Sequence, residues 1–164
     1  MSTTFTLLSQ FTIIACALVA GVFLAFSDFI MRSLANTGGA GGVETMQVIN
    51  REVFRWIFMA LFLGLAPVSL LVAGYGLVHL PTPAGPLMAL AGIVYVLGCF
   101  GVTIVFNVPM NEALAKMDAG TGTARDYWTG IYLPRWTFWN SVRAGASALS
   151  AVLLLVALTR LAQS

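Results

Sequence analysis

Four polar side chains stand at the ends of apolar stretches in this chain. Asn107 and Asn111 lie four residues apart on one stretch, and Asn140 and Arg143 lie three apart on another. Spacings of three or four place two side chains on one face of a helix. A polar group at membrane depth is costly unless it pairs with a partner or meets a ligand. Together these residues could stabilise a phenolate, an enolate or a carboxylate, so they are the first candidates for a site.

The last apolar stretch carries a stripe of polar and aromatic residues. Trp136, Asn140, Arg143 and Ser147 recur at spacings of four, three and four residues, which predicts one shared helix face. Arg143 either snorkels to the membrane surface as an anchor or faces inward toward a partner or ligand. In the second case we expect Arg143 and Asn140 to be catalytic and Trp136 to bind substrate. Four other aromatic residues are typical of a belt at the membrane surface: Tyr127, Trp128, Tyr132 and Trp139.

Pro109 lies between Asn107 and Asn111 and predicts an irregular helix there. It has no N–H to donate to the carbonyl of Val105, and it disfavours the α conformation at Val108. The helix should therefore stop or kink. The two asparagines either satisfy the freed backbone groups or aim their amides at a ligand oxygen, and in the second role both bind substrate.

Three further candidates, Asp28, Gln47 and Asn50, lie near the first two apolar stretches. Asp28 is a carboxylate within an apolar sequence, and Arg32 follows four residues later, a spacing that favours a local ion pair. In an apolar pocket Asp28 could instead act as a general base. Gln47 and Asn50 are three apart in an amphipathic segment and could contribute substrate-binding amides to the same site.

The elements that position these residues are four apolar stretches, at about 7–31, 53–78, 84–106 and 138–161. Hydrophobic residues make up 59% of the chain and charged residues 9%, against roughly 25% charged residues in a soluble domain. Each stretch has the roughly 20 residues needed to span the hydrocarbon core. The sequence predicts an all-α fold, a bundle of four transmembrane helices that forms a single domain over 1–164.

A weak internal repeat with an offset of 80 residues runs through the chain. Arg55-Trp56 corresponds to Arg135-Trp136, and the glycine-bearing linkers 38–42 and 120–122 also correspond. One interpretation is two helical hairpins of the same orientation, related by an axis along the membrane normal. The other is that two similar hairpins share arginine and tryptophan anchors at the membrane surface.

The distribution of cations predicts the orientation. The connections after the first and third stretches, with the adjoining helix ends, hold Arg32, Arg51, Arg55, Lys116, Arg125, Arg135 and Arg143, whereas the opposite side holds Arg160 and His79. The excess of positive charge on cytoplasmic loops places both longer loops in the cytoplasm and both termini outside. We expect an integral protein of a bacterial inner membrane.

Several chemistries lack their residues in this sequence. His79 is the only histidine, and it lies on the opposite side from the candidates without a Cys or carboxylate neighbour, so we expect no metal or haem centre. No phosphate-binding glycine loop or dinucleotide fingerprint is present. The net charge of +2, without a basic run, argues against a nucleic-acid partner. Cys16 and Cys99 are expected to be small buried side chains. We expect no cofactor.

Four motifs, spread over nearly the whole chain, together resemble a known family. They are Gly21-x-Phe23-x-x-Phe26-Ser27, Met46-Gln47-x-Ile49-Asn50, Asn107-x-Pro109-x-Asn111-x-x-Leu114 and Trp136-x-x-x-Asn140-x-x-Arg143. In these residues the chain resembles the anthrone oxygenase-like family of small four-helix membrane proteins. The resemblance implies a four-helix membrane fold, and its characterised fungal members are implied to oxidise anthrones to anthraquinones with molecular oxygen. Asp28 stands where a proline is expected, so the resemblance supports membership of the family more strongly than it supports the family's substrate.

Two functional hypotheses follow. In the first, the chain is a cofactor-independent membrane oxidoreductase or monooxygenase that acts on a small apolar aromatic compound such as an anthrone or quinol. A base removes an acidic proton, and the amides with Arg143 hold the resulting oxyanion. In the second, it is a non-enzymatic membrane module that binds a lipid, a quinone or a partner membrane protein. The expected ligand is an apolar small molecule or a lipid, and a homo-oligomer is possible.

Overall fold

The computed structural model describes residues 2–55, 57–79 and 83–163, and in these ranges the chain is helical without a strand. In chain order the elements are α1 (Thr3–Ala25), η1 (Phe26–Ile30), α2 (Met31–Ala35), α3 (Gly41–Glu52), η2 (Val53–Arg55), α4 (Ile57–His79), α5 (Ala84–Val94), η3 (Tyr95–Gly101), η4 (Thr103–Asn107), α6 (Val108–Ala115), α7 (Gly122–Tyr127), η5 (Trp128–Tyr132) and α8 (Leu133–Ala162). The segment η2 is a 3₁₀-helix, and the other η segments are π-helical.

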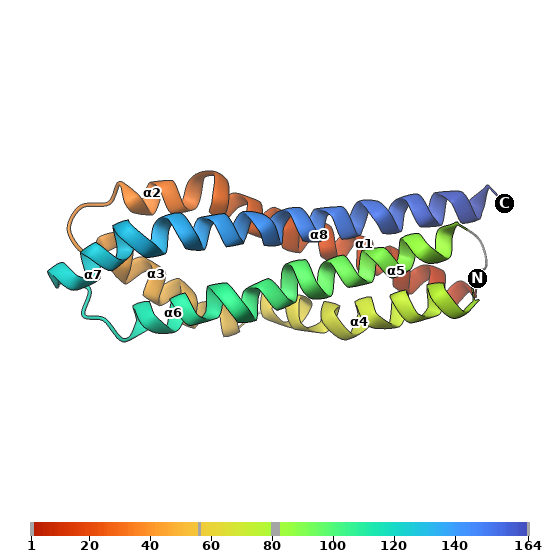
Figure 1. The fold of residues 1–164 in the computed structure, drawn as a ribbon, viewed down its shortest axis with the longest axis horizontal. Helices are drawn as coiled ribbons and strands as arrows, with labels where there is room; N and C mark the ends of the chain where they lie inside the picture. Colours follow the sequence, from red (N-terminus) through yellow and green to blue (C-terminus); the bar gives the residue numbers. More distant parts are fainter. Residues whose placement is uncertain (1, 56, 80–82, 164) are drawn as a thin grey trace.

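These elements form four antiparallel rods. Rod 1 comprises α1, η1 and α2; rod 2 comprises α3, η2 and α4; rod 3 comprises α5, η3, η4 and α6; rod 4 comprises α7, η5 and α8. Both termini lie at one end of the bundle, and the connections after α2 and α6 lie at the other (Figure 1). Within the described residues four helical stretches, one in each rod, are long and apolar enough to cross a membrane. The prediction of an all-α bundle with four transmembrane helices is confirmed.

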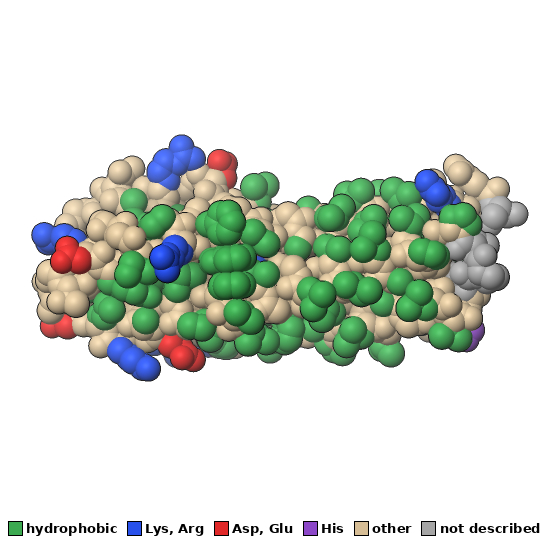
Figure 2. Space-filling model, viewed as in Figure 1, with side chains coloured by type: hydrophobic (Ala, Val, Ile, Leu, Met, Phe, Trp, Pro, Cys, Tyr) green, Lys and Arg blue, Asp and Glu red, His purple; other side chains and the backbone are tan. Residues whose placement is uncertain are grey.

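Charge divides the bundle into two halves. We define the membrane half as α1, α4, α5, η3 and the part of α8 from Arg143 onward, and the loop-side half as the remaining elements. Between Ile57 and Val78 the sequence of α4 has no charged residue, and α1 and α4 have 23 residues each. That length is about 34 Å at 1.5 Å per residue, close to the roughly 30 Å of a hydrocarbon core. Figure 2 shows charged side chains gathered mainly over the loop-side half.

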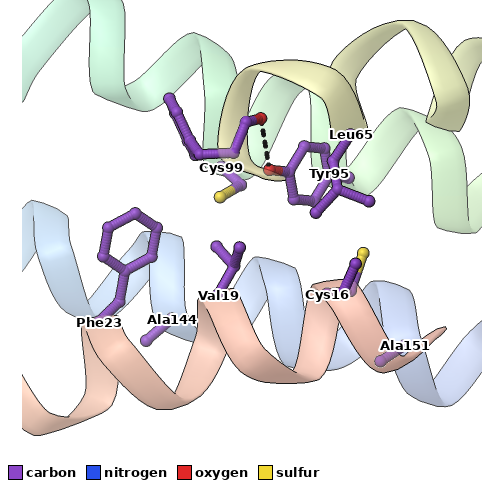
Figure 3. Packing of buried hydrophobic residues seen from close by; sticks show 10 residues of the cluster. Cys16, Val19, Phe23, Leu65, Tyr95, Cys99, Ala144 and Ala151 are labelled. Carbon is purple, nitrogen blue, oxygen red and sulfur yellow. Dashed lines mark hydrogen bonds between the residues drawn. The ribbon is translucent and has the colours of Figure 1, made fainter. Parts of the chain in front are cut away.

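The membrane half is held together by apolar contacts among side chains that range from alanine to phenylalanine and tyrosine. In Figure 3, Cys16, Val19 and Phe23 project from α1 toward Leu65, Tyr95 and Cys99 on the facing rods, with Ala144 and Ala151 of α8 beside them. The Tyr95 hydroxyl donates to the carbonyl of Phe62 at 3.0 Å. Both cysteines are fully buried, as predicted.

A glycine allows α4 and α5 to approach closely. A Cβ at Gly92 would lie 2.8 Å from the Cβ of Ala73 and closer still to the carbonyl oxygen of Ser69. Any larger residue must push the two helices apart. Close approach through small residues is typical of helices in lipid, where packing replaces the hydrophobic effect between helices.

The loop-side half has its own core, and it corrects one prediction. Trp128 and Tyr132 are buried there with Met31, Met46 and Leu114. These two aromatic side chains therefore do not belong to a surface belt. The prediction was wrong because the loop-side half extends the bundle, and both residues lie inside that extension.

The repeat is visible in the two turns at the loop-side end. The N–H groups of residues 36, 37 and 41 donate to the carbonyls of residues 33, 34 and 38, and residues 116, 117 and 121 repeat the pattern with residues 113, 114 and 118. Helices α2 and α6 end at Ala35 and Ala115, also 80 residues apart. The two hairpin turns thus share one local structure. The correspondence at Trp56 lies outside the described residues.

Candidate functional site

A cavity of about 110 Å³ lies where the two halves of the bundle meet. Its walls come from α1 and η1, from the segment where α3 gives way to η2 and α4, from η4 and α6, and from α8. Most of the lining is apolar: Val22, Phe23, Phe26, Met46, Ile49, Val53, Phe54, Phe58, Met59, Phe62 and Val108. The polar and indole groups among the lining residues are Asn50, Thr103, Asn111, Trp136 and Arg143. An apolar chamber with a few convergent polar groups is the usual form of a small-molecule site.

Arg143 is the dominant polar group of this cavity. Its Nη2 donates to Asn140 Oδ1 at 2.6 Å and its Nη1 to Thr103 Oγ1 at 3.3 Å. The guanidinium carbon lies 4.2 Å from the Phe23 ring centroid and 5.2 Å from that of Trp136. Nε is buried and has no partner in the described part of the chain.

No carboxylate pairs with Arg143 among the described residues. The residue is only 5% exposed, so a full positive charge sits in a largely apolar setting. A buried charge without a counter-charge is strongly unfavourable, and cation–π contacts offset only part of that cost. The arrangement favours an anionic ligand, or a group that becomes anionic during a reaction.

Asn140 positions the Arg143 guanidinium through its amide oxygen. Its Nδ2 donates to the carbonyl of Phe23 at 2.6 Å and to Ser27 Oγ at 2.7 Å. These two acceptors determine which side of the amide is the donor, so Oδ1 must face Arg143. Asn140 is fully buried and does not line the cavity. It is therefore placed to position Arg143, with no direct contact to a ligand in the cavity.

Asn111 also lines the cavity and is oriented by two hydrogen-bond donors. Its Oδ1 accepts from the Tyr132 hydroxyl at 2.7 Å and from Trp136 Nε1 at 2.8 Å. The Nδ2 group has no hydrogen-bond partner among the described residues, and Asn111 lines the cavity. Asn50 Nδ2 in turn donates to the Tyr132 hydroxyl at 3.3 Å. This series of hydrogen bonds leaves the Nδ2 group of Asn111 available to a ligand as a donor, and the amide oxygen of Asn50 available as an acceptor.

Asn107 and Gln47 lie outside the cavity lining and make structural contacts. Asn107 is fully buried, and its Nδ2 donates to the carbonyl of Trp136 at 3.2 Å, which joins rods 3 and 4. Its Oδ1 has no partner within the described residues. Gln47 Nε2 donates to the carbonyls of Leu114 and Met117 at 2.8 and 2.9 Å, which caps the end of α6.

Pro109 changes the helix type without ending the rod. The N–H of Val108 bonds to the carbonyl of Thr103, five residues back, and α6 continues directly with Pro109 in its first turn. The predicted irregularity of the helix is therefore present as a π-helical turn, but the rod does not stop at Pro109. The amide of Asn107 donates to rod 4 and not to a backbone group freed by Pro109.

Asp28 lies on the outside of the bundle. Its side chain is 69% exposed and its carboxylate is 3.6 Å from the Arg32 guanidinium, which also donates to the Asp28 carbonyl. The predicted local ion pair is confirmed. Asp28 does not line the cavity, so the structure gives it no apolar pocket of the kind a general base role assumed.

Three residues join the site that the sequence interpretation did not single out as candidates: Thr103, Tyr132 and Ser27. A signal existed for two of them. Thr103 continues the four-residue spacing of Asn107 and Asn111 by one turn. Tyr132 stands four residues before Trp136, and the two rings stack with centroids 6.0 Å apart. Ser27 carries no spacing signal, because its partner Asn140 comes from a distant rod.

The arrangement can bind a planar apolar molecule with one oxygen at the Arg143 end. Phenylalanine rings provide the walls, while the guanidinium and the Asn111 amide provide donors for a developing oxyanion. No group of three His, Cys, Asp or Glu side chains that could hold a metal ion is found in the part of the chain that the structure describes.

Comparison with known proteins gives one match. The model of a family described as "Anthrone oxygenase" matches residues 52–153. That range contains Thr103, Asn111, Trp136, Asn140 and Arg143. No curated protein and no solved structure matches the chain.

Proposed function

Because this chain belongs to the anthrone oxygenase family, we propose that it is a membrane-embedded oxygenase acting on a small aromatic compound with an acidic C–H group, such as an anthrone. The observation that supports this most directly is Arg143. Its guanidinium lines an apolar cavity, is buried, and has no carboxylate partner among the described residues. An anionic intermediate would supply the missing negative charge.

The proposed reaction balances without an added reductant. An anthrone and O₂ give an anthraquinone and water, and the substrate methylene group supplies all four electrons that reduce O₂. First, a C–H bond breaks to give the enolate, which adds O₂; the released proton then completes a hydroperoxide. Second, the remaining C–H bond and the O–O bond break, which forms the new carbonyl and releases water. The substrate itself therefore serves as the electron donor.

The chain's residues have separate tasks in this proposal. Arg143 and the Asn111 amide hold the enolate oxygen, where a charge interaction is strong because water is largely excluded. The rings of Phe23 and Phe26 pack against the aromatic body. No described carboxylate lines the cavity, so the first proton passes to a single water molecule held at the Asn50 amide oxygen, which returns it to the hydroperoxide.

Oxygen uptake with anthrone tests the proposal. The purified wild-type protein is compared with Arg143→Gln and with Arg135→Gln, a matched control in which an exposed arginine of the same helix is changed. We expect Arg143→Gln to lower uptake about 100-fold, the usual cost of losing one oxyanion donor. Arg135→Gln should stay within about twofold of wild type. Because anthrones also oxidise slowly in air, the protein-free rate is subtracted. Equal uptake by all three folded proteins would contradict the proposal.

A second candidate, a non-enzymatic membrane module, has one observation in its favour. Arg143 contacts Phe23 of α1, Thr103 of η4 and Asn140 of its own helix, so it could simply hold the rods together. In that case Arg143→Gln should unfold at a much lower temperature than Arg135→Gln. If the guanidinium serves a ligand, its removal should leave the unfolding temperature unchanged or raise it, because a buried charge is lost.

The proposed location is a bacterial inner membrane, with the loop-side half in the cytoplasm and both termini outside. The cations support this orientation: six of them are exposed on the loop-side half, and the opposite end has Arg160. A reporter enzyme fused after Ala162 that is active only outside the cytoplasm tests it. Activity in whole cells is expected, and its absence with normal expression would reverse the orientation.

A further inference from the structure

We infer that the ligand reaches the cavity sideways from the lipid, between Val22 of α1 and Phe54 of η2, and is therefore a membrane-dissolved aromatic compound. The oxygen-bearing ligand is taken from the proposed function, but the access route concerns binding alone. Nothing about oxidation is needed to establish it.

Two of the cavity-lining residues are exposed on the outer surface of the bundle. Val22 is 39% exposed and Phe54 is 69% exposed, while the other lining residues are buried or half-buried. Both belong to the apolar wall and come from neighbouring rods. The inferred opening is placed here because these two apolar side chains are the described lining residues with the largest exposure.

The surroundings of this opening are those of a surface that faces lipid. Leu18, one turn from Val22 on α1, is exposed, and so is Ile57, which follows η2 by two residues. Glu52 and Arg55, one on each side of Phe54 in the sequence, are exposed and form an ion pair at 3.3 Å. The sequence thus changes from charged to apolar within a few residues of Phe54. This change places the opening at the boundary between headgroups and acyl chains, where amphipathic aromatic molecules gather.

The cavity is apolar at its exposed border and polar deeper inside, which suits an amphipathic ligand that enters from the lipid. Its exposed border is apolar, whereas its donors belong to buried or half-buried residues, Arg143 and Asn111. A weakly acidic aromatic molecule that leaves the membrane can enter through Val22 and Phe54 and meet the guanidinium with its oxygen. A water-borne anion would instead have to pass the apolar border first, at a cost in desolvation.

The experiment measures binding rates without oxygen, in protein embedded in lipid nanodiscs. The probe is 2-naphthol, a membrane-soluble and weakly acidic aromatic compound, and its binding is followed by quenching of tryptophan emission, to which Trp136 in the cavity wall contributes. Val22→Phe narrows the opening, and Leu18→Phe is its matched control on an exposed site that does not line the cavity. We expect Val22→Phe to slow association and dissociation by about tenfold each, with a dissociation constant within threefold of wild type. Leu18→Phe should leave both rates within about twofold.

A second pair of variants works in the opposite direction. Phe54→Ala should widen the opening and raise both rates several-fold, whereas Phe29→Ala, at an exposed phenylalanine away from the cavity, should not. Unchanged rates in Val22→Phe and Phe54→Ala would overturn the inferred route.

These experiments distinguish a failure of the inferred access route from a failure of the proposed function. If the rates respond as expected but oxygen uptake does not depend on Arg143, the route stands and the oxygenase proposal fails. If uptake depends on Arg143 but the rates ignore Val22 and Phe54, the oxygenase proposal stands and the route fails.

Discussion

In the membrane half the rods meet mainly through apolar packing, and side-chain hydrogen bonds such as those from Tyr95 to the Phe62 carbonyl and from Ser147 to the Cys16 carbonyl add to it. In the loop-side half and at the cavity, hydrogen bonds of amide, indole and guanidinium groups join the rods. Gly92 brings α4 and α5 together, and hydroxyls such as Ser9 and Thr12 donate to carbonyls of their own helix. At the cavity, by contrast, Asn140 bonds to rod 1 and Asn111 to rod 4. From this difference we expect substitutions in the membrane half to lower stability, and substitutions in the polar network at the junction to lower the proposed activity.

Asn140→Ala is expected to have the largest effect and tests the functional side of this comparison. It removes the acceptor of Arg143 Nη2 and leaves the guanidinium poorly positioned, so oxygen uptake should fall between 10- and 100-fold. Stability should fall by only about 1–2 kcal/mol, the usual cost of buried hydrogen bonds lost. Uptake per folded protein and the unfolding temperature are both measured. A protein that is fully active, or that no longer folds, would break the comparison.

Gly92→Ala should lower stability and leave activity nearly unchanged. The added Cβ collides with Ser69 and Ala73, and overpacking of this kind costs about 2 kcal/mol. Uptake per folded protein should stay near wild type, because Gly92 does not line the cavity. Gly74→Ala is the matched control, since its Cβ meets nothing within 4 Å. The unfolding midpoint in detergent is measured for both, and equal midpoints would contradict the proposed tight contact.

Tyr132→Phe is expected to have a moderate effect on the site. It removes one of the two donors that orient Asn111 and the acceptor of Asn50, at a cost of about 1 kcal/mol in stability. We expect KM for the aromatic substrate to rise several-fold, with a smaller change in kcat. Steady-state oxygen uptake gives both values. If kcat falls far more than KM rises, Tyr132 takes part in the reaction itself and not only in positioning Asn111.

Asp28→Asn should have the smallest effect. An exposed ion pair contributes less than about 1 kcal/mol, and Asp28 does not line the cavity, so uptake should remain within twofold of wild type. This variant also tests the general base role that the sequence allowed. A loss of activity above tenfold, with the protein folded, would assign Asp28 to the reaction after all.

The sequence predicted the bundle well, because the signals involved are strong and local. Uncharged stretches of about 20 residues define the spans. The spacing of Trp136, Asn140 and Arg143 predicts one shared helix face, and their burial shows that this face points inward, which was one of the two alternatives left open for Arg143. The two turns at the loop-side end also follow from glycines and an 80-residue offset.

The rest of the site could not be predicted, since it depends on contacts between distant rods. Whether Asn140 touches a ligand or positions Arg143 is decided by Ser27 and the Phe23 carbonyl, more than 110 residues earlier in the chain. Asp28 faces outward because of its position within the π-helical turn η1. The spacing of residues in the sequence does not predict which side of the rod that position faces. The packing of the loop-side half, which buries Tyr132, is likewise a property of the assembled rods.

The π-helical turns bear on how this chain is to be aligned with its relatives. In η1, η4 and η5 the closing N–H bonds to the carbonyl five residues back, as from Met31 to Phe26 and from Val108 to Thr103. Each such turn holds one residue more than an α-helical turn, so deleting one there rotates everything beyond it by about 100°. Such a deletion between Thr103 and Asn107 would turn Asn111 out of the cavity while leaving the composition almost unchanged. In an alignment, a single-residue gap at one of these turns would therefore mark a relative in which the site is changed although the membrane helices are kept.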